Sequence, residues 1–184
     1  MFCVTLAIYY ALNIAYSMGL KALSLIDIFI VSSGFVFRVI GGGIICNIEI
    51  SHWLFIMTFL LALFIALAKR RDDVLIELRS GEKMRHSISG YTLEFVDSTL
   101  SILCGVLIVS YILYITSSDI GLRIGNRYAF SSAIFVIMGI FRYLQITLVE
   151  KGSGSPTKIL INDRFLQIVI LLWVLFFGAL LYSR

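Results

Sequence analysis

The stretch that decides the fold reads WLFIMTFLLALFIALA from Trp53 to Ala68 and continues without a break into KRRDD from Lys69 to Asp73. The first part is apolar nearly all round, which is typical of a helix that faces lipid. The second part places five charged residues in a row directly after it. This order predicts a membrane-spanning helix whose end carries a cluster of basic and acidic groups.

The charged cluster is hard to explain as a device for helix stability alone. Lys69 and Asp73 stand four residues apart with the cation first, which is the weaker order for a stabilising helical pair. Basic and acidic side chains gathered where a membrane helix reaches water favour an interaction with phosphate groups. The cluster is therefore the first candidate for a functional site.

Composition extends the membrane interpretation to the whole chain. Of 184 residues, 60% are hydrophobic and 14% are charged, and the mean hydropathy is +0.99. These values lie outside the range of soluble domains. Six apolar segments are long enough for spanning helices. They are residues Phe2 to Leu20, Leu25 to Ile48, Trp53 to Ala68, Leu93 to Thr116, Tyr128 to Val149 and Phe165 to Tyr182.

We therefore predict an all-α, polytopic membrane helix bundle with about six transmembrane helices, forming a single domain over residues 1–184. A membrane barrel would need alternating strands of about ten residues, and these segments do not alternate. Cys3, Cys46 and Cys104 lie in apolar segments without CxxC spacing, and His52 and His86 fit no zinc pattern. No redox or zinc role is assigned.

Basic residues in the loops predict the orientation. One side holds ten of them and the other holds three: Lys21, Lys69, Arg70, Arg71, Arg79, Lys83, Arg85, Lys151, Lys158 and Arg164 against Arg123, Arg127 and Arg184. By the positive-inside rule the richer side is cytoplasmic, so the chain is predicted in the cytoplasmic (inner) membrane with its site facing the cytoplasm. The net charge of +4 then concerns anionic substrates and membrane lipids rather than nucleic acid.

Two long loops are predicted on this side. The first covers Lys69 to Glu94 and contains a short surface helix that ends near Ser80, and the second covers Glu150 to Arg164. A helix through the first loop would put Lys69, Asp73 and Glu77 on one face, with Asp72 beside them. Carboxylates so placed can hold Mg²⁺, which bridges phosphate oxygens. The alternative is a basic patch bound to anionic lipid, which the acidic residues disfavour.

Two arginines lie within apolar segments. Arg38 is expected deep in the bilayer, facing either a polar cavity or an acid on a neighbouring helix. Gly41 to Gly43, just beyond it, lack a GK[ST] motif and indicate close helix packing or a local break rather than a phosphate loop. Arg142 is explained either by snorkelling to the headgroups or by a phosphate contact.

Several separate motifs occur in one order along the chain. They are Tyr16-Ser17-Met18-Gly19-Leu20-Lys21, Gly34-Phe35-Val36-Phe37-Arg38, Ala68 to Asp73, Gly90-Tyr91 with Phe95-Val96-Asp97, Gly139 to Tyr143, and Ser155-Pro156-Thr157 leading to Asp163-Arg164. In these motifs the chain resembles the UbiA-type intramembrane prenyltransferase superfamily, in particular its decaprenyl-phosphate phosphoribosyltransferase branch.

The resemblance implies a nine-helix bundle whose two acid-rich cytoplasmic motifs hold Mg²⁺ and a diphosphate. This chain is similar to the last six helices, and the first motif, of NxxxDxxxD type, has no counterpart in it. Met1 already lies inside an apolar run, without a basic leader or cleavage site. The chain is therefore expected to start within the domain, lacking three helices, or else with an uncleaved first helix.

The second motif of the superfamily, DxxxD, reads Lys69-x-x-x-Asp73 here. A cation at that position suits phosphoribosyl diphosphate, so the resemblance implies phosphoribosyl transfer to a polyprenyl phosphate, with release of pyrophosphate, for cell envelope biosynthesis. The implied roles are catalytic for Lys69 and Asp73 and metal-binding for Asp72 and Asp73. The implied substrate contacts are Tyr16, Lys21, Arg38, Arg70, Tyr91, Arg142, Asp163 and Arg164.

Three alternatives stay open at this point. An aromatic prenyltransferase would use the same fold with a polyprenyl diphosphate as donor. A non-catalytic subunit or remnant would explain the lack of the first acidic motif. A transporter fragment would explain Arg38, although the charged loops suit it less well. The sequence gives no prediction of the oligomeric state.

Overall fold

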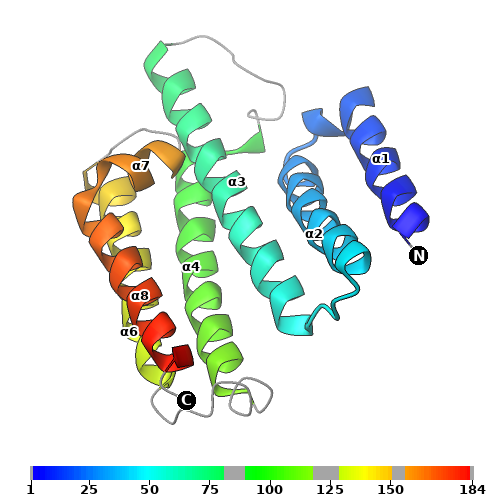
Figure 1. Cartoon of the computed structure of the whole chain (residues 1–184). Helices are drawn as coiled ribbons and strands as arrows, with labels where there is room; N and C mark the ends of the chain where they lie inside the picture. The colour runs from blue at the N-terminus through cyan, green and yellow to red at the C-terminus, as the bar shows by residue number, and fades with distance from the viewer. Residues whose placement is uncertain (1, 81–89, 118–128, 151–155, 183–184) are drawn as a thin grey trace. The chain divides into compact units, whose positions relative to one another are not determined.

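The computed structural model describes residues 2–80, 90–117, 129–150 and 156–182, and every regular element within these ranges is helical. This confirms the all-α prediction (Figure 1). The chain divides into two compact units, Met1–Leu100 and Ser101–Arg184, which are described separately below. The single domain predicted for residues 1–184 stays a prediction.

The first unit is built on three long helices and the start of a fourth. These are α1 (Phe2–Met18), α2 (Ile26–Cys46), α3 (His52–Ser80) and the first turns of α4 (Leu93–Thr116), with a short 3₁₀ helix, η1 (Leu20–Ala22), between α1 and α2. Helix α2 packs against both α1 and α3. Apolar side chains of α2, α3 and α4 are buried here, among them Ile28, Leu67, Val96 and Leu100. These apolar side chains form the core of the unit.

Helix α3 corrects the predicted loop. Its 29 residues run without interruption from His52 through the charged cluster to Ser80. At 1.5 Å per residue it is roughly 43 Å long, against roughly 30 Å for the hydrocarbon core of a bilayer. The charges therefore lie on the last third of a membrane helix rather than in a loop with its own short helix. Lysine, arginine, leucine and glutamate are all good helix formers, so the cluster gives no reason for the helix to stop.

Helix α2 is continuous through Gly41 to Gly43, so the predicted local break is wrong, and the alternative of close helix packing stays a prediction. It ends with Asn47 in the left-handed conformation (φ 54°), while Ile48 N–H donates to the Gly43 carbonyl and Asn47 N–H to that of Ile44. This is a Schellman motif. A Cβ on Gly43 would lie 2.6 Å from the Ile50 side chain and 3.1 Å from the Ile48 carbonyl oxygen, so a larger residue here would require the turn after α2 to shift.

The second unit contains the rest of α4 and the C-terminal helices. A 3₁₀ turn, η3 (Ala129–Ser132), leads into α6 (Ala133–Leu144), which continues as a π-helical turn, η4 (Gln145–Val149). Helices α7 (Pro156–Asn162) and α8 (Arg164–Tyr182) follow, and α6 packs against α8. Inside the unit, the Tyr111 hydroxyl lies 2.9 Å from Ser132 Oγ and accepts a hydrogen bond of 2.9 Å from Trp173 Nε1.

Helix lengths support a multi-pass membrane protein with fewer full spans than predicted. Four helical stretches are long and apolar enough to cross a bilayer, namely Ile26–Cys46, His52–Arg79, Leu93–Thr116 and Ala129–Val149. Helices α7 and α8 make a fifth if the pair, bent by 83°, counts as one span. The predicted first span corresponds to α1, an apolar helix of 17 residues. The described part of the chain thus gives four or five spans by this measure, rather than six.

Candidate functional site

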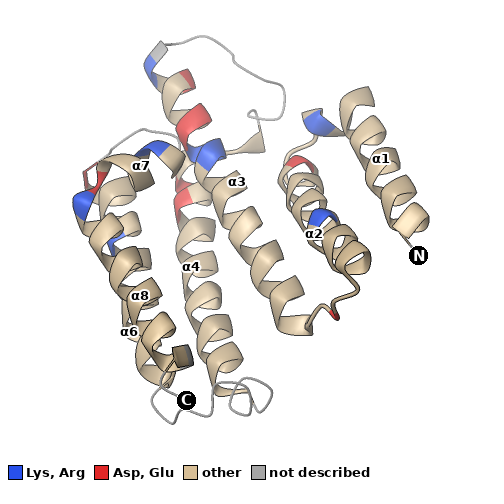
Figure 2. Cartoon of the chain, viewed as in Figure 1, with Lys and Arg blue, Asp and Glu red and all other residues tan. Residues whose placement is uncertain are grey.

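The charged third of α3 is divided between the protein interior and its surface. A helix distributes adjacent side chains about 100° apart, so the five charges from Lys69 to Asp73 point in different directions. Arg70 and Arg71 are buried, at 5% and 4% exposure, whereas Lys69 is exposed. Figure 2 shows charges of the first unit gathered on η1, at the start of α2 and on the last third of α3.

Asp27 lies in the first turn of α2 and is fully buried, with an exposure of 0%. Arg70 Nε donates to its Oδ2 at 2.6 Å, and the Tyr91 hydroxyl donates to its Oδ1 at 2.8 Å. A buried carboxylate is costly unless it is paired and hydrogen-bonded. Both oxygens of Asp27 meet that condition. These contacts join the start of α2, the charged part of α3 and the segment before α4, as expected for loops on one side of the membrane.

Arg70 links Asp27 to a second carboxylate. Its Nη1 donates to Asp73 Oδ2 at 2.5 Å, three residues further along α3. The Asp73 side chain is 21% exposed, so this group reaches the surface while Asp27 does not. One guanidinium therefore bridges a buried acid and an accessible one. We call Asp27, Arg70, Asp73 and Tyr91 the Asp27 network.

Tyr91 fixes the backbone at the start of α2. Its hydroxyl accepts a hydrogen bond of 2.7 Å from Leu25 N–H while it donates to Asp27. Leu25 has φ 68° and ψ −48°, a conformation that is costly for a leucine and persists only when its surroundings hold it. Burial raises the pKa of the Tyr91 hydroxyl well above its usual value; the Leu25 bond opposes this, and the bond to Asp27 adds to it.

Arg71 serves a different purpose from Arg70. Its Nε donates to Asp97 Oδ1 at 2.6 Å, and Asp97 belongs to the second turn of α4. Adjacent arginines on α3 thus pair with acids on two different helices, Arg70 with α2 and Arg71 with α4. This corrects the view that stability explains the cluster poorly, because two of its five charges form ion pairs between helices.

The other predicted residues of this end lie nearby in the chain but outside the network. Lys69 makes no ion pair with any described residue, and its side chain faces the exterior. Lys21 is exposed on η1. Asp72 is partly buried on α3. The structure therefore brings together Arg70, Asp73 and Tyr91 from the predicted set and leaves two cations accessible.

The fit of a metal ion can be tested on the carboxylates. Within residues 2–80, 90–117, 129–150 and 156–182, no three Asp, Glu, His or Cys side chains form a group that could hold a metal. Asp72 and Asp73 are adjacent on α3 and diverge by about 100°, so they do not face each other. The residues fit Mg²⁺ held by one carboxylate together with phosphate oxygens, but not a cage of protein ligands.

Tyr16 and Arg38 line a cavity of about 180 Å³ between α1 and α2, together with Tyr9 and Asn13. Arg38 lies roughly 18 Å along α2 from its start, inside the span. Its Nη2 donates to the Tyr9 hydroxyl at 3.0 Å, and its guanidinium carbon lies 5.3 Å from the centre of the Phe35 ring. Of the two predictions for Arg38, the polar cavity is observed, and no acid pairs with it among the described residues.

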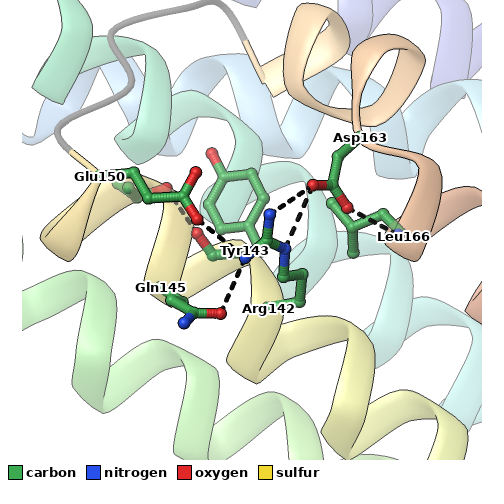
Figure 3. A network of polar contacts seen from close by, with 7 residues as sticks. Arg142, Tyr143, Gln145, Glu150, Asp163 and Leu166 are labelled. Carbon is green, nitrogen blue, oxygen red and sulfur yellow. Dashed lines mark hydrogen bonds and ion pairs between the residues drawn. The ribbon is translucent and has the colours of Figure 1, made fainter.

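Arg142 in the second unit is the centre of another network (Figure 3). Its Nη2 donates to Asp163 Oδ2 at 2.7 Å, and its Nη1 donates to Gln145 Oε1 at 2.9 Å and to Glu150 Oε1 at 2.8 Å. Asp163 also accepts the Leu166 N–H at 2.7 Å, which caps the start of α8. We call this set the Arg142 network. Arg164, the first residue of α8, is exposed.

Asp27 is the residue that the sequence interpretation missed. It lies near the start of the apolar segment from Leu25 to Ile48, for which the sequence predicts a membrane span. A signal was present, because an ionisable residue next to an apolar run is a functional candidate by default. Its partners stand 43 and 64 positions away, so no local pattern could name them.

Comparison with known proteins gives one consistent result. The chain is 32% identical to the decaprenyl-phosphate phosphoribosyltransferase of Mycolicibacterium smegmatis over 97% of this chain and 58% of that protein. It is 33% identical to the protein of the same name from Corynebacterium glutamicum, over 92% and 51%, and 30% identical to that of Mycobacterium tuberculosis, over 95% and 56%. The chain thus spans about half the length of these curated relatives. No family model matches it.

Proposed function

Since this chain is a homologue of the decaprenyl-phosphate phosphoribosyltransferases over nearly all of its length, we propose that it takes part in phosphoribosyl transfer at a membrane. The donor is phosphoribosyl diphosphate, and the acceptor is a long polyprenyl phosphate such as decaprenyl phosphate. The observation that carries the proposal is the identity of 30–33% to three such enzymes over at least 92% of the chain.

The proposed reaction needs little covalent chemistry from the protein. A phosphate oxygen of the polyprenyl phosphate attacks C1 of the ribose, the new C1–O bond forms, and the bond to the diphosphate breaks with release of pyrophosphate. The nucleophile is already an anion, so no strong base is required. The contribution of the protein is to position both substrates and to stabilise the departing negative charge.

Accessible cations at the Asp27 network support this assignment. Lys69 and Lys21 are exposed, so both can contact phosphate groups, and Arg70 adds a fixed positive charge beside Asp73. We assign Lys69 and Lys21 to phosphate contacts and Asp73 to the ribose or the metal. Arg164, in the second unit, stays a proposed phosphate contact of that unit. Tyr16, Arg38, Arg142 and Asp163 remain proposed substrate contacts.

Mg²⁺ is proposed as the cofactor, with Asp73 and Asp72 as the candidate protein ligands. When bound, the ion would neutralise negative charge on the diphosphate of the donor. The protein residues act around it: Arg70 holds one oxygen of Asp73, and the exposed lysines offset phosphate charge.

The proposed location is the cytoplasmic membrane, with the Asp27 network on the cytoplasmic side. The support is the distribution of basic residues, since ten of the 15 lysines and arginines fall in the segments that the sequence predicts on that side. A donor that is a soluble sugar phosphate would reach the site from the cytoplasm, and the acceptor would reach it from the lipid.

The test is transfer of labelled phosphoribosyl diphosphate to polyprenyl phosphate in proteoliposomes with Mg²⁺. This chain is assayed beside the full-length mycolicibacterial relative, which serves as positive control. Formation of a labelled lipid that requires the chain supports the proposal. Label that stays in the donor, with the control active, refutes the activity for this chain. Consumption of a polyprenyl diphosphate and an aromatic acceptor instead would identify an aromatic prenyltransferase.

A further inference from the structure

We infer that Asp27 is a positioning residue, which fixes the carboxylate of Asp73 through the guanidinium of Arg70. The inference rests on the proposed function for the role of Asp73, but the chain of contacts stands by itself. Asp27 is fully buried and touches no bulk solvent, so it acts on a ligand only through other residues.

The geometry supports transmission through Arg70. Nε is bound to Asp27 at 2.6 Å and Nη1 to Asp73 at 2.5 Å, and both nitrogens belong to one rigid, planar guanidinium. Fixing one edge of that plane therefore fixes the direction of the other. Oδ2 of Asp73, which accepts from Arg70, is held in place. Oδ1 of Asp73 accepts no hydrogen bond from the described residues, so this oxygen is available to a ligand.

Tyr91 binds the other oxygen of Asp27. Its hydroxyl donates to Asp27 Oδ1 and accepts from Leu25 N–H, so it connects the carboxylate to the strained backbone at the start of α2. The side chain of Asp27 is thus fixed at both oxygens. A carboxylate restrained in this way sets the position of Arg70 more firmly than a single surface ion pair would.

The neighbouring pair of Arg71 and Asp97 provides the contrast. It also joins α3 to another helix through a buried arginine, with Nε to Oδ1 at 2.6 Å. Arg71, however, is bonded to Asp97 and not to Asp73. Asp97→Asn is therefore a matched control for the loss of an interhelical ion pair without a direct link to Asp73.

The first test is a double-mutant cycle on thermal unfolding in detergent, which needs no ligand. The variants are Asp27→Asn, Asp73→Asn and their combination. In each single variant Arg70 keeps one carboxylate, and in the double variant it keeps none. We therefore expect the double variant to lower the midpoint by more than the sum of the single shifts. Asp27→Asn combined with Asp97→Asn should be additive, because Arg70 and Arg71 are different groups.

The second test compares binding of labelled phosphoribosyl diphosphate with Mg²⁺ to Asp27→Asn and Asp97→Asn. Loss of a residue that orients a ligand-binding side chain typically lowers the affinity of the site about 10- to 100-fold. We expect at least about tenfold weaker binding for Asp27→Asn and a change of less than about twofold for Asp97→Asn.

The outcomes separate this inference from the proposed function. If the unsubstituted chain binds no donor, the proposed function fails for this chain, and the thermal cycle still decides whether Asp27 and Asp73 are coupled. Additive shifts for Asp27 and Asp73 overturn the positioning role. So does equal weakening of donor binding by Asp27→Asn and Asp97→Asn, because that would indicate a general loss of stability.

Discussion

The two arginine networks differ in depth and in the length of chain that they connect. Arg70 has a side-chain exposure of 7% and bonds to Asp27, which is 43 residues away and fully buried. Arg142 has a side-chain exposure of 24%, and its three partners lie 3, 8 and 21 residues away. The Asp27 network joins helices over 43 to 64 residues of chain, whereas the Arg142 network joins the end of α6 to the start of α8 over at most 21.

Depth decides how much each network matters for stability. Breaking a buried ion pair leaves an uncompensated charge away from water, whereas exposed pairs are screened and contribute little. The same types of residue are therefore expected to respond very differently to substitution. The Asp27 network should be sensitive to every member, and the Arg142 network should tolerate change.

The largest effect is expected for Arg70→Met. It removes the cation from buried Asp27 and leaves that carboxylate with the Tyr91 hydroxyl alone. Removal of one partner of a buried pair typically costs about 3–5 kcal/mol. Reversible unfolding in detergent would measure this loss. A shift no larger than that of Arg142→Met would contradict the difference between the two networks.

Tyr91→Phe should have the next largest effect. The change keeps the ring and removes the hydroxyl that bonds to Asp27 and Leu25. An unsatisfied buried polar group typically costs about 1–3 kcal/mol, measured again as free energy of unfolding. Tyr10→Phe on α1, where the tyrosine is exposed, serves as a control for the removal of a tyrosine hydroxyl. Equal losses in the two variants would argue against the role of Tyr91.

The pH dependence of stability, compared between Tyr91→Phe and the unsubstituted chain, tests the role of Tyr91 further. The pKa of Tyr91 is raised in the folded state, mainly by burial, so the folded protein holds this proton more tightly than the unfolded chain. The resulting stability is fully present below the ordinary tyrosine pKa of about 10 and is lost as the pH rises through the higher folded value. Tyr91→Phe should show a shallower loss of stability above about pH 10 than the unsubstituted chain. Parallel curves would show that Tyr91 does not cause the slope.

Lys69→Asp separates function from stability at the Asp27 network. Lys69 is exposed and forms no ion pair in the described part of the chain, so the melting midpoint should change little. A charged hydrogen bond contributes about 1.5–3 kcal/mol, so use of phosphoribosyl diphosphate should fall about tenfold or more. Lys158→Asp, on α7, is the matched control, because it also reverses the charge of an exposed lysine. Unchanged donor kinetics for Lys69→Asp would remove Lys69 from the proposed site.

Arg142→Met is expected to lower stability less than Arg70→Met. Its partners are partly exposed, and Asp163 keeps its bond to the Leu166 N–H after the change. The thermal midpoint should fall by much less than for Arg70→Met. A loss as large as that of Arg70→Met would mean that the Arg142 network holds its unit together as firmly as the Asp27 network holds the other.

The helices were predictable because hydrophobicity is a local property. The segment predicted from Leu93 to Thr116 has the same bounds as α4, and the segment from Leu25 to Ile48 differs from α2 by one residue at its start and two at its end. The predicted helix end near Ser80 is confirmed, but the break predicted at Lys69 is wrong, because a run of charges does not end a helix. Helix propensity does not fall at lysine or arginine, so the helix continues for as long as its backbone bonds are satisfied.

The candidate site was only partly predictable. Its cations and Asp73 could be chosen from one short run of sequence, and Tyr91 from a resemblance. Asp27 was missed, and the burial of Arg70 and Arg71 could not be foreseen, because burial depends on which helix faces which. The predicted roles of Lys69, Asp72 and Arg164 in binding stay predictions.

The sequence by itself determined that this chain forms apolar helices and that its cluster of charges marks a candidate site. These properties follow from hydrophobicity, propensity and charge, which each residue carries with it. The tertiary structure alone decided which charges are buried and what they touch. Arg70 meets Asp27 across 43 residues, and Arg71 meets Asp97 on another helix, because packing brings distant positions to distances at which opposite charges can replace water.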